Sequence, residues 1–137
     1  MKVENAVYPS PQRIASLAAT FSSGPIVMVN LLKFRARAEY KDGRSETITG
    51  QVAYMRYGAE MRKIVERAGG RLLFAGRVDG LVIGEVEELW DAVAVVEYPS
   101  RAKFQELVIS PEMQAIGVHR EAGLAGQLLI LTTATAF

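Results

Sequence analysis

Four stretches of the chain carry apolar residues at most positions and are short enough to be strands. IVMVNLLKFR, from Ile26, and WDAVAVVEYP, from Trp90, are apolar on both of their alternating faces. RLLFAGRV carries Arg71 and Arg77 at positions of one parity, and QLLILTT lies near the carboxyl end. Runs rich in β-branched residues between turn-forming residues predict strands. Two apolar faces indicate central strands, whereas two arginines on one face indicate an edge strand.

Helical spacing of apolar residues is clearest from Gln51 to Ala68, where charged residues occupy the opposite side. The following Gly69-Gly70 predicts the end of this helix, because a helix terminus commonly needs a left-handed residue. Ser100 and Ser110 are expected to cap two further helices, the second of which closes at Gly123.

Three connecting regions complete the prediction. Ser10 and Pro11 indicate a short leading helix. Residues 36–49 are polar and predict a long surface loop. The stretch LVIGEVEEL is either an extension of the second strand or a short extra strand.

Without the leading helix, the order is strand, helix, strand, strand, helix pair, strand. This order predicts an α+β fold of the ferredoxin-like type, β-α-β-β-α-β, with a four-stranded antiparallel sheet whose first and third strands are central. We expect one domain over residues 1–137, in which residues 1–23 form an N-terminal helical extension.

Both helical regions of this topology pack on one face of the sheet, which leaves the other face open. Either Val93 and Val95, or Ala92, Ala94 and Val96, would then meet water in a monomer. Burying one Val or Leu side chain contributes about 1.5 to 3 kcal/mol, so we expect a homodimer joined through this sheet face as a dimeric α/β barrel. The alternative is partial cover by the leading helix and the long loop.

Composition narrows the function classes. The chain has 137 residues, half of them hydrophobic, a net charge of +1 and no cysteine. Neither nucleic acid nor a membrane is an expected partner. Thiolate nucleophiles, disulfides and cysteine-ligated metals are excluded. No signal peptide pattern is present, so we expect a cytoplasmic protein.

Five ordered pieces resemble the bacterial family called domain of unknown function 1330, within the dimeric α/β-barrel superfamily. These pieces run from Gly24 nearly to the carboxyl end: GPIVMVNLLKFR, GQVAYMRYG, GGRLLFAG, WDAVAVVEYPSRAKF and HREAGL. At Met113 the chain departs from the family, whose members often carry an aromatic residue there. The resemblance implies a ferredoxin-like homodimer and no established reaction. Superfamily relatives include cofactor-free monooxygenases, lactone isomerases and haem-handling enzymes, which is an analogy of fold alone.

Several polar and aromatic residues are candidates for a ligand site. Asn30 lies mid-strand among apolar residues, so its amide needs a partner, either a ligand carbonyl or another part of the protein. Tyr54 and Tyr57 share one helical face and either bind a ligand through their phenols or pack in the core. Trp90 and Tyr98 share a parity and either line a pocket or fill the core.

His119 and Arg120 are candidates for chemistry. His119 is the only histidine and would serve as a base near neutral pH, while Arg120 would hold developing negative charge together with Asn30. The alternative is that both cations simply favour the negative end of a helix. With one His and no Cys, no transition-metal site and no cofactor are expected.

These residues leave three functions open. The first is a small-molecule pocket between sheet and helices, with cofactor-independent proton transfer or oxygenation as the reaction. The second is a non-catalytic ligand-binding or structural dimer. The third and weaker one is haem binding, which would require His119 to point into a cavity.

Overall fold

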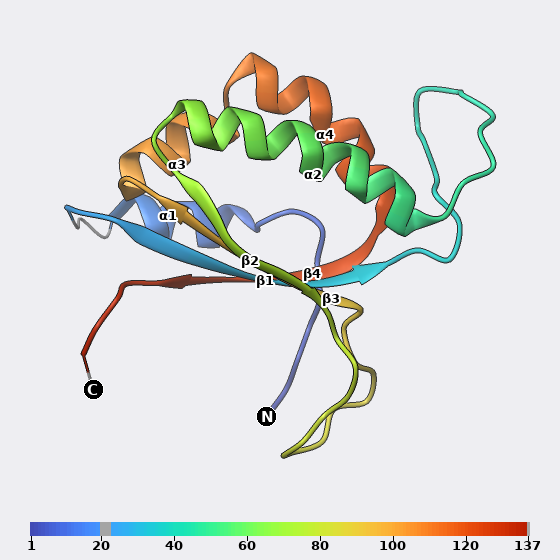
Figure 1. Cartoon of the computed structure of the whole chain (residues 1–137), viewed down its shortest axis with the longest axis horizontal. Coiled ribbons are helices and arrows are strands. Elements are labelled where there is room, and N and C mark those ends of the chain that lie inside the picture. The colour runs from blue at the N-terminus through green and yellow to red at the C-terminus, as the bar shows by residue number, and fades with distance from the viewer. Residues whose placement is uncertain (20–22, 137) are drawn as a thin grey trace.

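The computed structural model describes residues 1–19 and 23–136. The elements follow in the order α1 (Pro11–Ala19), β1 (Ile26–Phe34), α2 (Gly50–Arg67), β2 (Arg71–Arg77), β3 (Ala92–Tyr98), α3 (Arg101–Val108), α4 (Pro111–Gly123) and β4 (Leu124–Thr132). Figure 1 shows α2, α3 and α4 together on one side of the sheet. The predicted extension over residues 1–23 includes residues 20–22, which lie outside the described residues.

The four strands form one antiparallel sheet in the order β2-β3-β1-β4. The predicted ferredoxin-like topology is therefore confirmed, and so is the central position of β1 and β3. Each central strand pairs on both sides, and Val29 lies opposite both Val95 and Ile130. Strands with neighbours on both sides are buried most deeply, which is why these two carry apolar residues on both faces.

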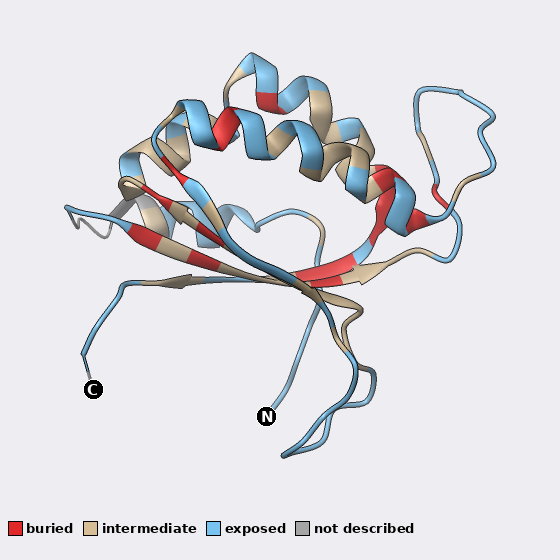
Figure 2. Cartoon of the chain, in the orientation of Figure 1, coloured by how far each residue is buried: buried red, intermediate tan, exposed pale blue. Residues whose placement is uncertain are grey.

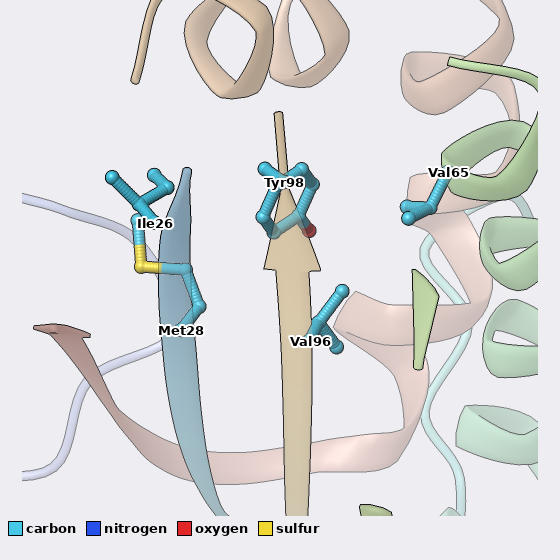
Figure 3. Packing of buried hydrophobic residues seen from close by; sticks show 5 residues of the cluster. All are labelled: Ile26, Met28, Val65, Val96 and Tyr98. Carbon is cyan, nitrogen blue, oxygen red and sulfur yellow. The ribbon is translucent and has the colours of Figure 1, made fainter. Parts of the chain in front are cut away.

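The hydrophobic core lies between the sheet and the helices. Ile26 and Met28 of β1 meet Val96 and Tyr98 of β3, and Val65 of α2 packs above them (Figure 3). All five are at most 8% exposed. The helix-facing residues of β3 are thus the even-numbered ones, which leaves Val93 and Val95 on the opposite face.

The helix boundaries follow the local signals in the sequence. Ser100 and Ser110 each accept a hydrogen bond from the backbone N–H three residues later, so both predicted caps are confirmed. Thr49 caps α2 in the same way. Gly69 has φ 91°, which is the left-handed conformation expected at the end of this helix.

Two details of the sequence prediction are wrong. A β-bulge between Leu72 and Phe74 shifts the register of β2, so Arg71 and Arg77 lie on opposite faces of the sheet although their parity is the same. The stretch LVIGEVEEL is neither an extra strand nor an extension; residues 78–91 form a long loop that leaves the sheet (Figure 1). Gly84, which has φ 95°, separates its apolar residues 81–83 from the mainly acidic residues that follow.

The face of the sheet opposite α2, α3 and α4 has no described helix over it (Figure 1). Val27, Val29 and Leu31 of β1 lie on this face and are only half-buried, and Phe74 and Ile130 are 58% and 44% exposed. Figure 2 shows the corresponding run of half-buried and exposed positions along the strands. None of the described helices is long and apolar enough to cross a membrane.

Candidate functional site

An open cleft of about 890 Å³ separates α2 from the β2–β3 half of the sheet. Its floor contains Leu32, Ala94 and Val96, and its roof contains Tyr54 and Met61. The volume falls in the range of small-molecule sites, and the lining is mostly apolar with a few polar groups. We take this cleft as the candidate ligand site.

The cleft exists because small residues face each other across it. Gly58 and Ala59 lie on the α2 side, and Ala75, Ala92 and Ala94 lie on the sheet side. A Cβ added at Gly58 would meet nothing within 4 Å. Larger residues at these positions would interdigitate and close the layer, as they do in the core around Val65.

Most polar groups of the cleft lie at the end where α2 begins, whereas Arg62 lines it farther along this helix. Arg35, Thr49, Gln51 and Asp91 line this end. One guanidinium nitrogen of Arg35 lies 3.0 Å from Glu39, whereas its buried Nε has no hydrogen-bond partner among the described residues. The buried Nε is itself shielded from the cleft, but the charge of the guanidinium and the start of α2 would favour an anionic or carbonyl oxygen at this end of the cleft.

Asp91 is held in place by the backbone rather than free in the cleft. Its Oδ2 accepts a hydrogen bond from the Phe34 N–H at 2.8 Å, and its Oδ1 lies 3.4 Å from Lys33 Nζ. Both oxygens are therefore occupied by donors. The carboxylate fixes the end of β1 against the start of β3.

Behind the cleft, a chain of partly buried polar side chains joins β1, β4 and α4. Asn30 donates to the Ala94 carbonyl at 3.1 Å and accepts from Gln127 Nε2 at 2.7 Å. Arg120 donates to Gln127 Oε1 and to the Val7 carbonyl, both at 2.7 Å. The structure thus brings Asn30 and Arg120 together through Gln127, a residue that the sequence analysis did not single out.

The two tyrosines of α2 pack against each other, and only Tyr54 reaches the cleft. Tyr54 lines the cleft, and its ring lies 5.4 Å from the rings of both Phe34 and Tyr57. The Tyr57 hydroxyl points to the sulfur of Met113 at 3.9 Å. Burial raises the pKa of both phenols, and the nearby charge of Arg120 partly opposes this. Both side chains are therefore neutral donors at physiological pH.

His119 lies apart from the other candidates. Its Nδ1 is 2.6 Å from the hydroxyl of Tyr40, which belongs to the long loop over residues 36–49, and it does not line the cleft. Partial burial, with the positive charges of Arg44 and Arg56, lowers the pKa of His119. Adjacent helical residues diverge, which is why Arg120 faces the sheet while His119 faces the loop.

The remaining aromatic candidates are also separated. Tyr98 is buried in the core, with its ring 4.9 Å from that of Phe104. Trp90 donates its indole N–H to Asn5 Oδ1 at 2.7 Å. Neither lines the cleft, and each has a partner that positions it. No group of three or more metal-ligating side chains occurs among the described residues.

Comparisons with known proteins place the chain in its family. The model of the family described as Domain of unknown function (DUF1330) matches residues 43–134. The crystal structure of RPA0582, a protein of unknown function from Rhodopseudomonas palustris, is 33% identical, with coverage of 97% of this chain and 99% of that chain and a TM-score of 0.86. No curated protein matches the chain.

More distant solved structures share the fold alone. SnoaB, a cofactor-independent oxygenase from Streptomyces nogalater, is 11% identical, covers 84% of this chain and 97% of that chain, and has a TM-score of 0.54. A hydroxynitrile lyase from Passiflora edulis is 13% identical, with coverage of 85% and 99% and a TM-score of 0.54. The matched family model and the near full-length similarity to RPA0582 show that this chain belongs to the DUF1330 family, with a ferredoxin-like fold.

Proposed function

We propose that the protein binds a small, partly apolar organic molecule in the cleft between α2 and the sheet. The observation that carries this proposal is the cleft of about 890 Å³ with small residues on both walls. An open, mostly apolar cleft of this size with a few polar groups at one end has the usual form of a small-molecule site.

The ligand's polar end would lie at Arg35. The charged guanidinium of Arg35 and the start of α2 provide positive potential at one end of the cleft. The apolar body of the ligand would then extend over Ala94 and Val96. A carboxylate or enolate attached to a flat or narrow apolar skeleton fits this distribution of groups.

The geometry supports binding more directly than catalysis. The predicted base, His119, is hydrogen-bonded to Tyr40 and is not part of the cleft, while Asn30 and Arg120 satisfy each other through Gln127. Proton transfer or oxygenation without a cofactor stays a prediction for this protein. The fold does not choose between reactions, because one neighbour of this fold is an oxygenase and another is a lyase.

We further propose that the protein works as a homodimer joined through the uncovered sheet face. Phe74 and Ile130 on that face are each more than 40% exposed, and the valines between them are only half-buried. A second copy would bury this apolar strip around a twofold axis. The cleft lies on the other side of the sheet and would stay open in such a dimer.

The cleft is tested by filling it. We would screen a panel of aromatic and aliphatic carboxylates by thermal shift and compare wild type with Gly58→Leu and, as a matched control, Gly117→Leu. Both glycines are helical and both face open space, but only Gly58 lines the cleft. A ligand at one hundred times its dissociation constant stabilises the folded protein by about 2.7 kcal/mol.

We expect hits to stabilise wild type and Gly117→Leu and to lose their effect on Gly58→Leu. Arg35→Met should weaken carboxylate hits more than their amide analogues. Equal stabilisation of wild type and Gly58→Leu by every hit would place the ligand elsewhere and refute the proposal.

A further inference from the structure

The loop between β2 and β3, residues 78–91, forms an arm that projects from the sheet. It extends on the side of the sheet opposite α2, α3 and α4, the side on which the amino-terminal segment also lies (Figure 1). Val82 and Ile83 at its tip are 96% and 89% exposed, and Leu81 is 46% exposed. Apolar side chains presented this fully to water indicate a contact surface.

The root of the arm is fixed to the sheet. The Val78 N–H donates to the Asp91 carbonyl at 2.9 Å, and the Asp91 N–H donates to the Leu32 carbonyl at 2.7 Å. Lys33 Nζ, on the uncovered face, lies 3.0 Å from Glu88. These bonds fix the root of the arm to the sheet, and its tip projects away from the strands (Figure 1).

The charge of the arm is opposite to that of the rest of the protein. Residues 78–91 contain five acidic residues and no basic one, whereas the remaining residues contain ten acidic and sixteen basic ones. Asp79, Glu88 and Asp91 are paired with Arg77 or Lys33. Glu85 and Glu87 have no ion pair with any residue that the structure describes.

We propose that the arm docks on the body of a second copy of this chain, with Val82 and Ile83 buried against it. This inference rests on the homodimer proposed above. A second copy that covers the sheet face approaches from the side on which the arm projects (Figure 1), and its body carries the basic excess that the acidic arm lacks. Two arms repel each other because both are acidic, so each arm meets the partner's body rather than the partner's arm.

The test compares two places where a valine is followed directly by an isoleucine in the sequence. Val82→Ser/Ile83→Ser removes the apolar tip, and Val108→Ser/Ile109→Ser is the matched control at the end of α3, where Ile109 is 77% exposed. Dimer dissociation constants are measured by analytical ultracentrifugation. Removing two large apolar contacts on each of two arms should raise the constant by about a hundredfold or more for the arm variant. The control should match wild type.

A second test changes the charge of residues 78–91. Glu85→Lys/Glu87→Lys should also raise the dissociation constant of the dimer, by about tenfold or more at low ionic strength, and less at high salt because exposed charges are screened. Wild type should likewise dissociate more readily as salt is added.

Crosslinking identifies the docking surface directly, because the chain has no native cysteine. Ile83→Cys carrying a photoreactive maleimide should crosslink to residues outside 78–91, and mixed isotope-labelled and unlabelled protein should show that the crosslinks join different chains.

The outcomes separate the arm from the dimer. A wild-type dimer whose dissociation constant is unchanged by the tip variant, or whose crosslinks stay within one chain, overturns the arm proposal while leaving the sheet-face dimer intact. A wild-type protein that stays monomeric at high micromolar concentration overturns both. Weakening by the sheet-face variant Phe74→Glu, without weakening by the tip variant, assigns the interface to the sheet alone and refutes the arm.

Discussion

At the scale of single residues, the most consequential feature is the hydrogen-bonded chain of two amides and a guanidinium behind the cleft, in which Gln127 is buried and the others are partly buried. Gln127 is only 7% exposed and bonds both Asn30 and Arg120. Its amide nitrogen donates to the Asn30 oxygen, and its amide oxygen accepts from the Arg120 guanidinium. A buried polar residue of this kind is favourable only while all of its partners remain in place.

Replacing Gln127 with Leu should therefore destabilise the protein by about 2 to 4 kcal/mol, because the Asn30 amide oxygen loses its donor and the Arg120 guanidinium loses one of its two acceptors. Urea unfolding measures the change in free energy. Gln114→Leu is the control, since Gln114 is exposed and bonds only the Val108 carbonyl at 2.8 Å; its effect should be about 1 kcal/mol or less. Equal losses in the two variants would contradict the importance of this hydrogen-bonded chain.

His119 gives the folded state a dependence on pH. Because partial burial, Arg44 and Arg56 lower the pKa of His119 below its ordinary 6.5, the unfolded chain binds a proton more tightly than the folded one. Stability should thus fall as the pH drops from 7 through 6.5, until the folded protein also becomes protonated. The carboxylates of Asp42 and Glu46 near this histidine have lowered pKa values and contribute only at more acidic pH.

His119→Asn keeps a side-chain acceptor for the Tyr40 hydroxyl and removes the titrating group. We expect the free energy of unfolding of this variant to stay nearly constant between pH 7 and 5.5, while that of wild type declines. His119 is the only histidine in the chain, so no other side chain titrates normally in that window. Parallel curves for the two proteins would assign the decline to another group.

The sequence indicated some of these residues but not how they combine. Asn30 was recognisable as a polar residue in an apolar strand that needs partners. Gln127 was not recognisable as such, because it is the first residue of the apolar run QLLILTT, where a polar residue is ordinary. The pairing of His119 with Tyr40 depends on the path of the loop over residues 36–49, and no local pattern records that path. The cleft itself depends on Gly58 and Ala94 facing each other, which requires the register of helix on sheet.

At the scale of secondary-structure elements, α2 and α4 meet at a close crossing of their backbones. A Cβ added at Gly123 would overlap the Gly50 carbonyl oxygen and lie 2.9 Å from the Tyr54 nitrogen. A Cβ at Gly50 would overlap the Arg35 carbonyl, which accepts the Gly50 N–H at 3.0 Å. Glycine at both positions lets the start of α2 and the end of α4 sit against the end of β1.

Gly123→Ala should destabilise the protein by about 1 to 3 kcal/mol, because the added methyl group forces two backbones apart. Gly117→Ala, in the same helix, is the control: a Cβ there meets nothing within 4 Å, so alanine should stabilise the helix by about 0.5 to 1 kcal/mol. Thermal unfolding measures whether each variant has a lower or a higher melting temperature than wild type. A stabilising Gly123→Ala would show that the helices can separate without cost.

Most elements were predictable because their signals are local. The caps at Ser100 and Ser110 are predictable because each serine hydroxyl bonds a backbone N–H only three residues later in the sequence. The helix that begins at Gly50 is predictable from the spacing of its apolar residues. The bulge in β2 was not predictable from alternation, because the extra residue reverses the parity that alternation assumes. The prediction of a strand within residues 78–91 was wrong for a different reason. Their apolar tip has the composition of a strand but pairs with none of the described strands.

At the scale of the whole molecule, the uncovered sheet face is the feature that a monomer does not explain. Its apolar strip runs from Phe74 on β2 to Ile130 on β4, across both central strands. Folded monomers rarely expose continuous apolar strips of this kind. The proposed dimer removes the strip from water and leaves the cleft accessible.

The dimer makes stability depend on protein concentration. We expect the melting temperature of wild type to rise between about 1 and 100 μM, because association stabilises the folded state by mass action. Ile130→Glu should abolish this rise by placing a charge in the interface, and Ile109→Glu, at an exposed site outside it, should preserve the rise. A melting temperature that is independent of concentration in wild type would argue against the dimer.

The position of β1 at the centre of the sheet also has a consequence for how the chain is made. This strand lies near the amino end, yet its partners are Ala92–Tyr98 and, on its other edge, Leu124–Thr132. During synthesis, most of the polypeptide must leave the ribosome before β1 gains either neighbour. Contacts so distant along the chain form slowly, so we expect β1 to stay unpaired, with its apolar residues exposed, until the segments of β3 and β4 have been synthesised.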